Sequence, residues 1–447
     1  MAQVRQMLDK SLAIVLIGLL VPLLAACTGN TPASDTAPAA ATAPPATFAA
    51  PAESATEVPT ATAESAPEAP VTSEAADSTQ DVIHDIVRIP TGDERQVPEI
   101  RDIASWINSE PLTFGEQRGK VVLVDFWTYT CINCIRTFPF LKVWHEKYKD
   151  HGLVIVGVHA PEFDFEKERD NVVRATEEFG ITWPVAQDNE MGTWRAFNNR
   201  FWPAKYLVDA EGRIRYTHFG EGSYEETELW IRSLLIEAGA DLSRVSADTA
   251  PEPTHSSAAG AASPGLGLTR ELYAGYERNL GTLLSRSAPP YVAQREYFEN
   301  RDSEYNYQDP GDYENHFLYI QGLWRNEAER LVHARSTDGY EDYLATKFFA
   351  TSVNAVMAPG EGEPLKVRVL LDDEPISPEN AGVDVMFDGP DGPYIFVDGW
   401  RLYNIVTLAE FEGHVLKLSS NSPDFSLFAY TFGAYEGGEP AKVGPNG

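Results

Sequence analysis

The chain of 447 residues contains little cysteine and few basic residues. Its three cysteines are too few for a disulfide framework, so each one needs its own explanation. Lys and Arg number 35 against 67 Asp and Glu, which gives a net charge of −32. This balance argues against binding to nucleic acid phosphates. It also argues against a polybasic protein surface that binds membranes, because both depend on Lys and Arg. The length and an apolar fraction of 43% nevertheless allow two or three domains, each with its own core.

The first 26 residues are typical of a cleaved signal peptide. After a slightly basic start, residues 12–26 form an uncharged run that is shorter than the roughly 20 residues of a membrane-spanning helix. The run closes in a Leu-Ala-Ala-Cys motif at Cys27, which resembles the lipobox of bacterial lipoproteins. The resemblance implies that Cys27 becomes the first residue and carries acyl chains, so that the protein is extracytoplasmic and anchored to a bacterial membrane. A plain secretory signal is the alternative.

Composition divides the remainder into two folded blocks. Residues 27–80 are almost entirely Ala, Pro, Thr, Ser and Glu, which cannot bury enough apolar surface to fold and predict a disordered tether. A shorter stretch of the same kind, residues 239–264, predicts a linker. The folded blocks are therefore expected at residues 81–238 and 265–447.

Two cysteines follow a buried strand in the first block. Residues 121–126 form a nearly continuous apolar run, typical of a strand covered on both faces, and a helical pattern begins at Cys131 and ends at Gly152. Amides at a helix N-terminus stabilise an anion, so the pKa of Cys131 is expected to be lowered. Cys134, one turn later, can close a disulfide with Cys131 or resolve a mixed disulfide. The spacing predicts a redox dithiol.

Two other uses of this cysteine pair fit the sequence less well. A zinc site needs four ligands, and the chain has no second C-x-x-C motif and no His pair at ligand spacing, so no metal is expected. A structural disulfide across so short a loop would restrict the unfolded chain very little. No cofactor is expected beyond the cysteine pair itself. His145, His151, His159 and His218 are interpreted as surface or packing residues.

The order of the remaining patterns carries a family resemblance. After the dithiol helix we expect a strand (153–158), two helices (165–179 and 190–199), two strands (202–209 and 213–219) and a closing helix (225–238). Val-Asp-Phe-Trp before the cysteines, Pro139 after them and a late Pro203 resemble the thioredoxin superfamily. The stretches 119–134, 159–163 and 202–204 are similar to the DipZ-type thioredoxin-like proteins of the redoxin and TlpA-like branch. The resemblance covers roughly residues 95 to 238.

This resemblance implies roles for individual residues. Pro203 would be a cis-proline facing the dithiol, beside which an extended substrate segment binds. Asp125 would be a buried carboxylate with a raised pKa that accepts the proton of Cys134. Trp127 and Trp202 would lie on the substrate side, with Trp127 shielding the dithiol. The alternatives are an ordinary trans proline at a strand start, a structural aspartate and a tryptophan of the core.

The function that follows is an exported thiol–disulfide oxidoreductase, with a reductase of extracytoplasmic protein disulfides as the first choice. Apocytochrome c is the first expected client, and a separate membrane protein would supply electrons. The dipeptide between the cysteines matches neither thioredoxin nor the strongly oxidising enzymes, so the direction of electron flow stays open. A peroxidase is an alternative, since Thr128 stands three residues before Cys131 as in peroxiredoxins, although Val124 occupies the position of their proline.

The second block, residues 265–447, shows short alternating runs with Gly and Pro between them, which predicts an all-β, jelly-roll-like sandwich. It resembles the carbohydrate-binding-like C-terminal domain of DipZ-type proteins, so a glycan is a conceivable partner, although its many aromatic residues also fit a core. Its aspartates lack EF-hand spacing and are interpreted as loop residues. A surface lipoprotein that binds glycan or protein, with the first block as a scaffold, is the alternative from a different functional class.

Overall fold

The computed structural model describes residues 95–247, 253–256, 267–285, 289–360, 363–390 and 392–440. All of these residues belong to one compact unit, Ser73–Gly447. The expected signal peptide, Cys27 and the tether lie outside the described residues, as do residues 248–252 and 257–264 of the expected linker. No helix within the described ranges is long and apolar enough to cross a membrane.

Residues 95–247 are built on a six-stranded sheet with the order β1-β4-β3-β2-β5-β6. In the middle, β2 pairs in parallel with β3, and β3 pairs in parallel with β4. The outer pairs β1–β4, β2–β5 and β5–β6 are antiparallel. The strands are β1 (Ser105–Ile107), β2 (Val121–Trp127), β3 (Leu153–His159), β4 (Val185–Gln187), β5 (Ala204–Val208) and β6 (Ile214–Phe219).

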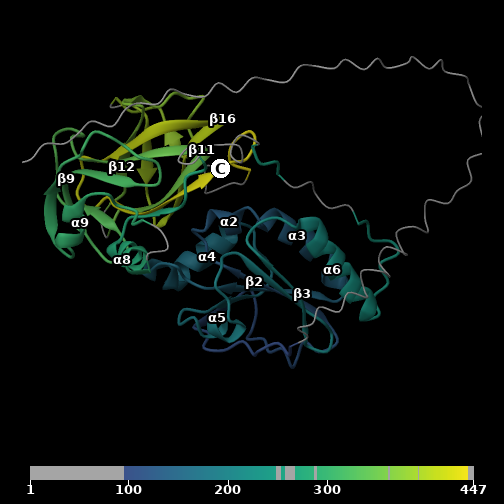
Figure 1. Cartoon of the computed structure of the whole chain (residues 1–447). Coiled ribbons are helices and arrows are strands. Elements are labelled where there is room, and N and C mark those ends of the chain that lie inside the picture. The colour runs from purple at the N-terminus through teal and green to yellow at the C-terminus, as the bar shows by residue number, and fades with distance from the viewer. Residues whose placement is uncertain are drawn as a thin grey trace, which may run out of the picture. The chain divides into compact units, whose positions relative to one another are not determined.

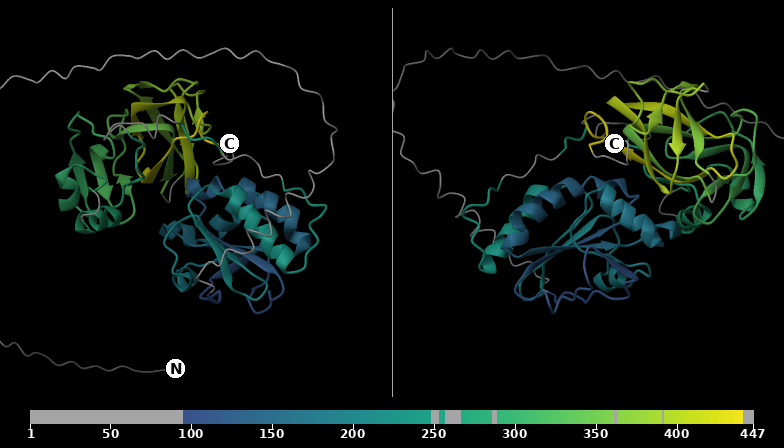
Figure 2. Two further views of the ribbon diagram at one scale, coloured as in Figure 1. Left: turned by 45° about the vertical axis from the view of Figure 1, so that its right-hand side comes forward. Right: turned by 180° about the vertical axis from the view of Figure 1, so that it is seen from behind.

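Helices lie on both faces of this sheet (Figure 1). Side chains alternate along a strand, so β2 sends Leu123 and Trp127 into a core shared with α3 and α6, and Val124 and Phe126 into a second core shared with α5. Figure 2 shows the sheet between these helices from two further directions. The helical segments are α2 (Ile132–Ile135), α3 (Phe138–Tyr148), η1 (Lys149–His151), η2 (Asp164–Lys167), α4 (Arg169–Glu178), α5 (Gly192–Phe197) and α6 (Tyr224–Glu237).

The second folded region is dominated by one 11-stranded sheet whose ladders between named strands are antiparallel. Its two longest strands, β11 (Tyr343–Ala358) and β16 (Arg401–Ser419), pair along most of their length, with register shifts near Ala350 and Val353. The first part of β11 also pairs with β9 (Leu318–Asn326), and its last part pairs with β17 (Ser426–Gly433). The pair β11–β16 thus connects β12 (Leu365–Leu371), which pairs with β16, to β9 and β17, which pair with β11.

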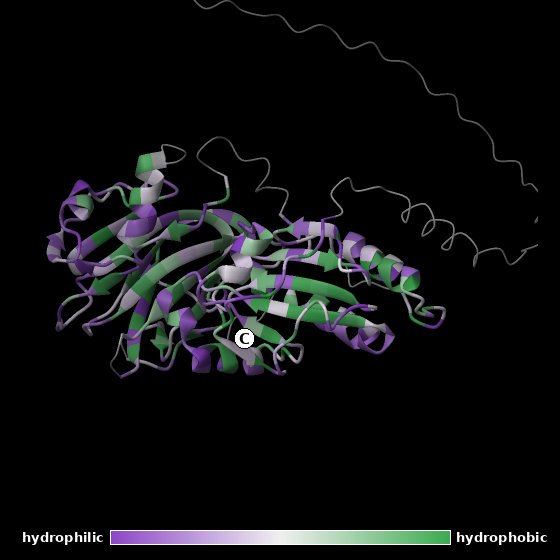
Figure 3. Ribbon diagram, turned by 90° about the horizontal axis from the view of Figure 1, so that it is seen from below, coloured by the Kyte–Doolittle hydropathy of each residue, from purple (hydrophilic) through white to green (hydrophobic). Residues whose placement is uncertain are grey.

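Shorter strands and two helices complete this region. Along β12 buried residues alternate with half-buried ones, the pattern of a strand with one face on a core. Figure 3 shows the strands of both regions as rich in hydrophobic residues. The remaining elements are β7 (Leu272–Tyr273), α8 (Tyr276–Ser285), α9 (Arg295–Glu299), β8 (Glu304–Tyr307), β10 (Leu331–His333), β13 (Glu374–Pro375), β14 (Val385–Met386) and β15 (Tyr394–Val397).

The expected fold class, a thioredoxin fold followed by an all-β domain, is confirmed. Several details differ from the expectations. The single helix expected after Cys131 is interrupted between α2 and α3, since Pro139 has no N–H to continue the ladder. The expected helix 165–179 is divided at Glu168 into η2 and α4. The short strands β1 and β4, and the helices α8 and α9 within the second region, were not expected.

Candidate active site

The two cysteines lie at the carboxyl end of β2, where the chain turns into α2. Cys131 is the N-terminal cap of α2 with an extended backbone, and the amide of Cys134 donates to the carbonyl of Cys131 at 3.0 Å. Both thiols are free. Cys131 is partly exposed, whereas Cys134 has no exposed surface. The first cysteine can therefore meet a reactant, and the second is held behind it.

The surroundings of Cys131 oppose a thiolate. Its pKa lies well above the usual value because of the hydrogen bond with Cys134 and burial, and because negative charge on Cys134, Glu271 and Glu162 adds to both. The expectation of a lowered pKa was therefore wrong. The physical reason is that α2 has a single turn and contributes little dipole, while the nearby acidic groups act against the anion.

Asp125 lies on β2 with an unexpected lysine opposite it. It shares the face of the strand that carries Leu123 and Trp127, and Cys134 is buried in the core on that face. The ammonium of Lys205, its cross-strand neighbour on β5, lies 3.3 Å from Oδ1 of Asp125. Burial raises the pKa of Asp125, as expected, and Lys205 counteracts part of the effect. The role of Asp125 as proton acceptor stays a prediction.

Proline 203 and its neighbour stand at the start of β5. The Trp202–Pro203 peptide bond is cis, as the resemblance implied. The indole N–H of Trp202 donates to the carbonyl of Ala160 at 3.0 Å, and its ring packs on Trp194 with centroids 4.3 Å apart. Trp202, just before β5, is thereby fixed against the loop that follows β3. Substrate binding by Pro203 and Trp202 stays a prediction.

Trp127 and His159 belong to the core. Trp127 is only 1% exposed and meets Phe138 and His159 edge to face, so the structure supports the alternative of a core tryptophan. Burial lowers the pKa of His159 to about 3, in agreement with a packing role. The hydroxyl of Thr128 is also buried and lies 3.4 Å from Nε2 of His159. It is thus turned to the interior, which does not favour the peroxidase alternative.

A buried acid in η2, Glu166, was not among the site residues expected from the sequence. The hydroxyl of Thr130, the residue before Cys131, donates to its Oε1 at 2.5 Å. Its Oε2 accepts the backbone N–H groups of Glu162 at 2.5 Å and Phe163 at 3.1 Å. Burial raises the pKa of Glu166 to about 7. An acid in the first turn after the 159–163 motif was the signal available in the sequence, since such acids accept free helix amides.

The second folded region supplies further groups around α2. The guanidinium of Arg136 binds both carboxylate oxygens of Glu439, at 2.8 and 2.7 Å, and one oxygen of Glu221 at 3.1 Å. It also lies over the ring of Tyr435, whose hydroxyl donates to Glu221 at 2.6 Å. We call Arg136, Glu221, Tyr435 and Glu439 the Arg136 patch. The sequence did not predict this patch, because its members are up to 303 positions apart.

A second set of contacts joins the loop after β3 to the start of the C-terminal domain. Glu162 accepts hydrogen bonds from the hydroxyl of Tyr273 at 2.9 Å and from Arg278 at 2.7 Å, both on Oε1. The same tyrosine hydroxyl lies 3.0 Å from Oε2 of Glu271. We call Glu162, Glu271, Tyr273 and Arg278 the Glu162 patch. The two patches bring the C-terminal domain to the dithiol region.

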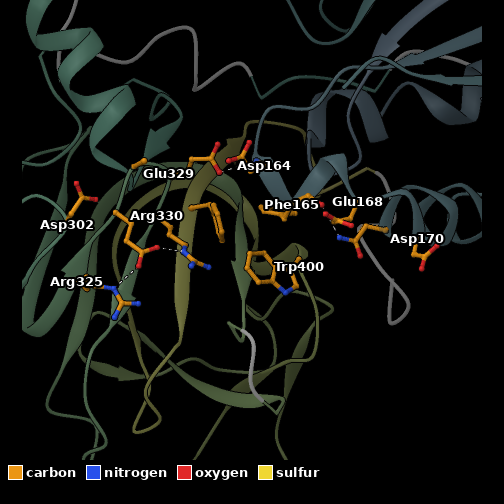
Figure 4. A pocket seen from close by; sticks show the side chains of 13 residues that line it. Asp164, Phe165, Glu168, Asp170, Asp302, Arg325, Glu329, Arg330 and Trp400 are labelled. Carbon is orange, nitrogen blue, oxygen red and sulfur yellow. Dashed lines mark hydrogen bonds and ion pairs between the residues drawn. The ribbon is translucent and has the colours of Figure 1, made fainter. Parts of the chain in front are cut away.

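A cavity of about 890 Å³ also lies between the two regions. Figure 4 shows Asp164, Phe165 and Glu168 on one side, and Arg330 and Trp400 on the other. The guanidinium of Arg330 lies 5.3 Å from the centre of the Trp400 ring. Neither cysteine lines this cavity, so it is separate from the dithiol.

Other candidate residues of the C-terminal domain are explained by packing or ion pairs. Tyr297, Tyr307 and Trp324 are fully buried in its core, which supports the core interpretation for these aromatics. Asp384 and Asp398 both pair with Arg401. In the first region, Asp209, Glu211 and Glu237 have oxygens within 4.8 Å of one another and offer a cation geometry, but arginines 213 and 215 pair with them.

Comparisons with known proteins agree with this architecture. Residues 92–229 match the Redoxin family, and residues 269–433 match a family described as Thioredoxin like C-terminal domain. The fold and the dithiol therefore define residues 95–247 as a thioredoxin-like domain whose sequence is similar to the redoxins. The chain is 43% identical over 183 residues to Protein DipZ of Mycobacterium tuberculosis, which covers 40% of this chain and 25% of that protein.

Other relatives match about a third of this chain. Protein SUPPRESSOR OF QUENCHING 1 of Arabidopsis thaliana is 36% identical over 35% of this chain and 15% of its own length. Thiol-disulfide oxidoreductase YkuV of Bacillus subtilis is 27% identical over 32% of this chain and 95% of its own. The solved thioredoxin-like superfamily protein SPOA0173 is 26% identical, with a TM-score of 0.30, over 31% of this chain and 96% of its own. The chain spans only a quarter of the DipZ proteins.

Proposed function

We propose that this protein is a thiol–disulfide oxidoreductase that reduces protein disulfides with the Cys131–Cys134 pair. The arrangement of the two thiols is the observation that carries the proposal. Cys131 is partly exposed and Cys134 is fully buried behind it, so a client disulfide can reach only the first sulfur. The kinship with Thiol-disulfide oxidoreductase YkuV supports the same chemistry.

The reaction consists of two exchanges. The thiolate of Cys131 attacks one client sulfur, a new S–S bond forms, and the client disulfide breaks. The second client sulfur leaves as a thiolate and takes up a proton. Cys134 then loses its proton, attacks Cys131 and releases the first client sulfur as a thiol. Two electrons have passed to the client, which now has two thiols, and the enzyme holds a disulfide.

Residues around the pair have roles that follow from the resemblance and fit their positions. Asp125, on the strand face shared with the core of Cys134, would accept the second proton. The cis-proline Pro203 and its neighbour Trp202 would bind the client backbone near the dithiol. Trp127 would act only from the core, since its side chain is buried.

The acidic surroundings favour the reducing direction. Strong oxidants such as DsbA owe their high potential to a stabilised reduced form. Here the hydrogen bond with Cys134 and burial raise the pKa of Cys131, and the charges of Glu271 and Glu162 raise it further, so that its thiolate is destabilised. A less stable thiolate means a less stable reduced form of the pair. The reduction potential is then lower, which makes the dithiol a better electron donor.

The test is the reduction potential of the full chain, equilibrated with glutathione or dithiothreitol and measured by alkylation of Cys131 and Cys134. We expect a value near about −270 mV, that of thioredoxin. A value near about −120 mV, that of DsbA, would contradict a reductase. Failure of the two sulfurs to form a disulfide would contradict any redox function.

The location and clients extend this proposal. The lipobox at Cys27 supports export and acylation, so clients would be extracytoplasmic proteins, with apocytochrome c first. Electrons would come from a membrane dithiol donor. A Cys27→Ala variant is expected to lose acylation and to leave the membrane fraction. Client identity would be tested by the mixed disulfides that a Cys134→Ser variant traps.

A further inference from the structure

The Glu162 patch contains two carboxyl groups and one hydroxyl hydrogen between them. The oxygen of Tyr273 lies 2.9 Å from Oε1 of Glu162 and 3.0 Å from Oε2 of Glu271. A tyrosine hydroxyl has one proton to donate, and an ionised carboxylate can only accept. If both carboxyl groups were ionised, the two contacts would have to share this single hydrogen, whereas a proton on one carboxyl group gives each contact a hydrogen of its own.

The position of Arg278 identifies which carboxyl group holds this proton. Its guanidinium binds Oε1 of Glu162 at 2.7 Å, and an adjacent cation favours the ionised form of a carboxyl group. Among the described residues Glu271 forms no ion pair of this kind, and its hydrogen-bond contact is with the tyrosine hydroxyl. Tyr273 then donates to the carboxylate of Glu162, and the acid of Glu271 donates to Tyr273.

We propose that Glu271 of the C-terminal domain holds a proton beside the dithiol, and that its gain or loss of this proton controls thiolate formation at Cys131. Glu271 is thus a positioning residue that acts on Cys131 by its charge. The inference deepens the proposed function and rests on it, because the thiolate of Cys131 is the group that attacks the client. It assigns the C-terminal domain a part in the redox site.

Two pKa directions support the geometry. Burial, with the charge of Glu162, raises the pKa of Glu271 to about 7, so its charge changes near neutral pH. The charges of Glu271 and Glu162 are among the causes that raise the pKa of Cys131. As the pH rises through about 7, Glu271 ionises and makes a thiolate at Cys131 harder to form. Reactivity of Cys131 should therefore rise less steeply with pH than for an isolated thiol.

Other titratable groups near the dithiol set the background for this effect. They lie on several elements around the dithiol and would titrate or exert charge alongside Glu271. They are Cys134 and Arg136 of the α2 segment, Asp125 and Tyr129 from β2 and the turn after it, His159 of β3, Glu162 and Glu166 of the following loop and η2, Lys205 of β5, Glu221, Tyr273, Arg278, Tyr435 and Glu439.

The test compares the alkylation rate of Cys131 in the reduced full chain with that of Glu271→Gln. Iodoacetamide is the probe, and peptide mass spectrometry follows Cys131 separately from Cys134. Above about pH 7 we expect Glu271→Gln to react roughly threefold to tenfold faster, since removal of a like charge favours the thiolate. Below about pH 6 the rates should converge, because protonated Glu271 in the wild type is then as neutral as the glutamine of the variant.

Glu277→Gln is the matched control, because Glu277 is an exposed acid six residues further along the same domain. Its alkylation profile should coincide with that of the wild type. Equal profiles for wild type and Glu271→Gln would overturn the inference. They would leave the proposed function standing if both proteins still reduce a client disulfide, whereas loss of exchange in the wild type would defeat the proposed function itself.

A measurement on the wild type protects the test from a folding defect in the variant. Infrared spectra of the full chain should show protonated carboxyl bands that disappear as the pH rises through about 7, and in Glu166→Gln the band of Glu271 remains without that of Glu166. Tyr273→Phe removes the bridging hydroxyl and should shift the midpoint of this transition, because the hydroxyl oxygen lies 3.0 Å from Oε2 of Glu271. An unchanged transition in Tyr273→Phe would contradict the shared proton.

Discussion

The Arg136 patch and the Glu162 patch have the same formal composition but satisfy their charges differently. Each contains one arginine, two glutamates and one tyrosine. In the Arg136 patch the guanidinium binds both Glu439 and Glu221, and its side chain is 4% exposed. In the Glu162 patch Arg278 is 44% exposed and binds Glu162, while the contact of Glu271 is with a phenol.

The difference separates a structural role from a chemical one. A guanidinium with two direct carboxylate partners fixes the C-terminal domain at a point two residues beyond Cys134. A carboxyl group whose partner is a neutral hydroxyl remains free to exchange a proton. The same residue types thus hold the domains together at one patch and adjust the ionisation of Cys131 at the other.

The largest expected effect tests whether the dithiol between these patches is the reaction centre. Cys131→Ser should lower the rate of client disulfide reduction by about a thousandfold or more, because it removes the nucleophile. The measurement is turnover of a fluorescent disulfide peptide with dithiothreitol as the electron source. Cys134→Ser is the matched control for loss of a thiol.

The control has its own signature. Cys134→Ser should still attack the peptide and should then remain as a mixed disulfide at Cys131, since no resolving thiol is present. Retained turnover in Cys131→Ser would show that the dithiol between the patches is not the reaction centre. It would support a scaffold role for the thioredoxin-like domain.

The next effect concerns the structural patch. Arg136→Ala leaves Glu439, whose side chain is 4% exposed, as a buried charge without its guanidinium. Loss of one partner of a buried ion pair costs about 3 to 5 kcal/mol in the free energy of unfolding. Urea unfolding followed by tryptophan fluorescence would measure it. Arg295→Ala, at a pair whose arginine is 86% exposed, should leave the midpoint unchanged; equal losses in both variants would refute the comparison.

The sequence predicted the fold where periodicity and motif agreed. The buried strand before Cys131, the cis bond before Pro203 and the class of both domains followed from apolar runs and resemblance. The strands β1 and β4 were missed because three-residue segments carry no clear period. Helices α8 and α9 were missed because the alternating runs around them favoured strands throughout the block.

The site was predictable only within short sequence distances. Cys131, Cys134 and Asp125 follow from one motif, but the causes that raise the pKa of Cys131 include, after Cys134 and burial, the charge of Glu271 in the other domain. Lys205 meets Asp125 through strand pairing that its position in the sequence does not reveal. Contacts of this kind arise from tertiary packing, so no local sequence pattern predicts them.

The smallest effect tests whether acids on this side of the dithiol act by holding protons. Burial raises the pKa of Glu166 to about 7 from an ordinary value of 4.5. Between these values the folded state binds more protons than the unfolded state, so the contribution of Glu166 to stability is present at low pH and is lost as the pH rises toward about 7. From about pH 5 to about pH 8 this loss amounts to about 2 to 3 kcal/mol in the free energy of unfolding.

The variant Glu166→Gln can still accept hydrogen bonds from the amides of Glu162 and Phe163. It should remove that part of the decline in the free energy of unfolding, measured with urea at both pH values. A decline of the same size in Glu166→Gln and in the wild type would show that Glu166 is ionised throughout, and that the proton-holding acids beside the dithiol do not include it.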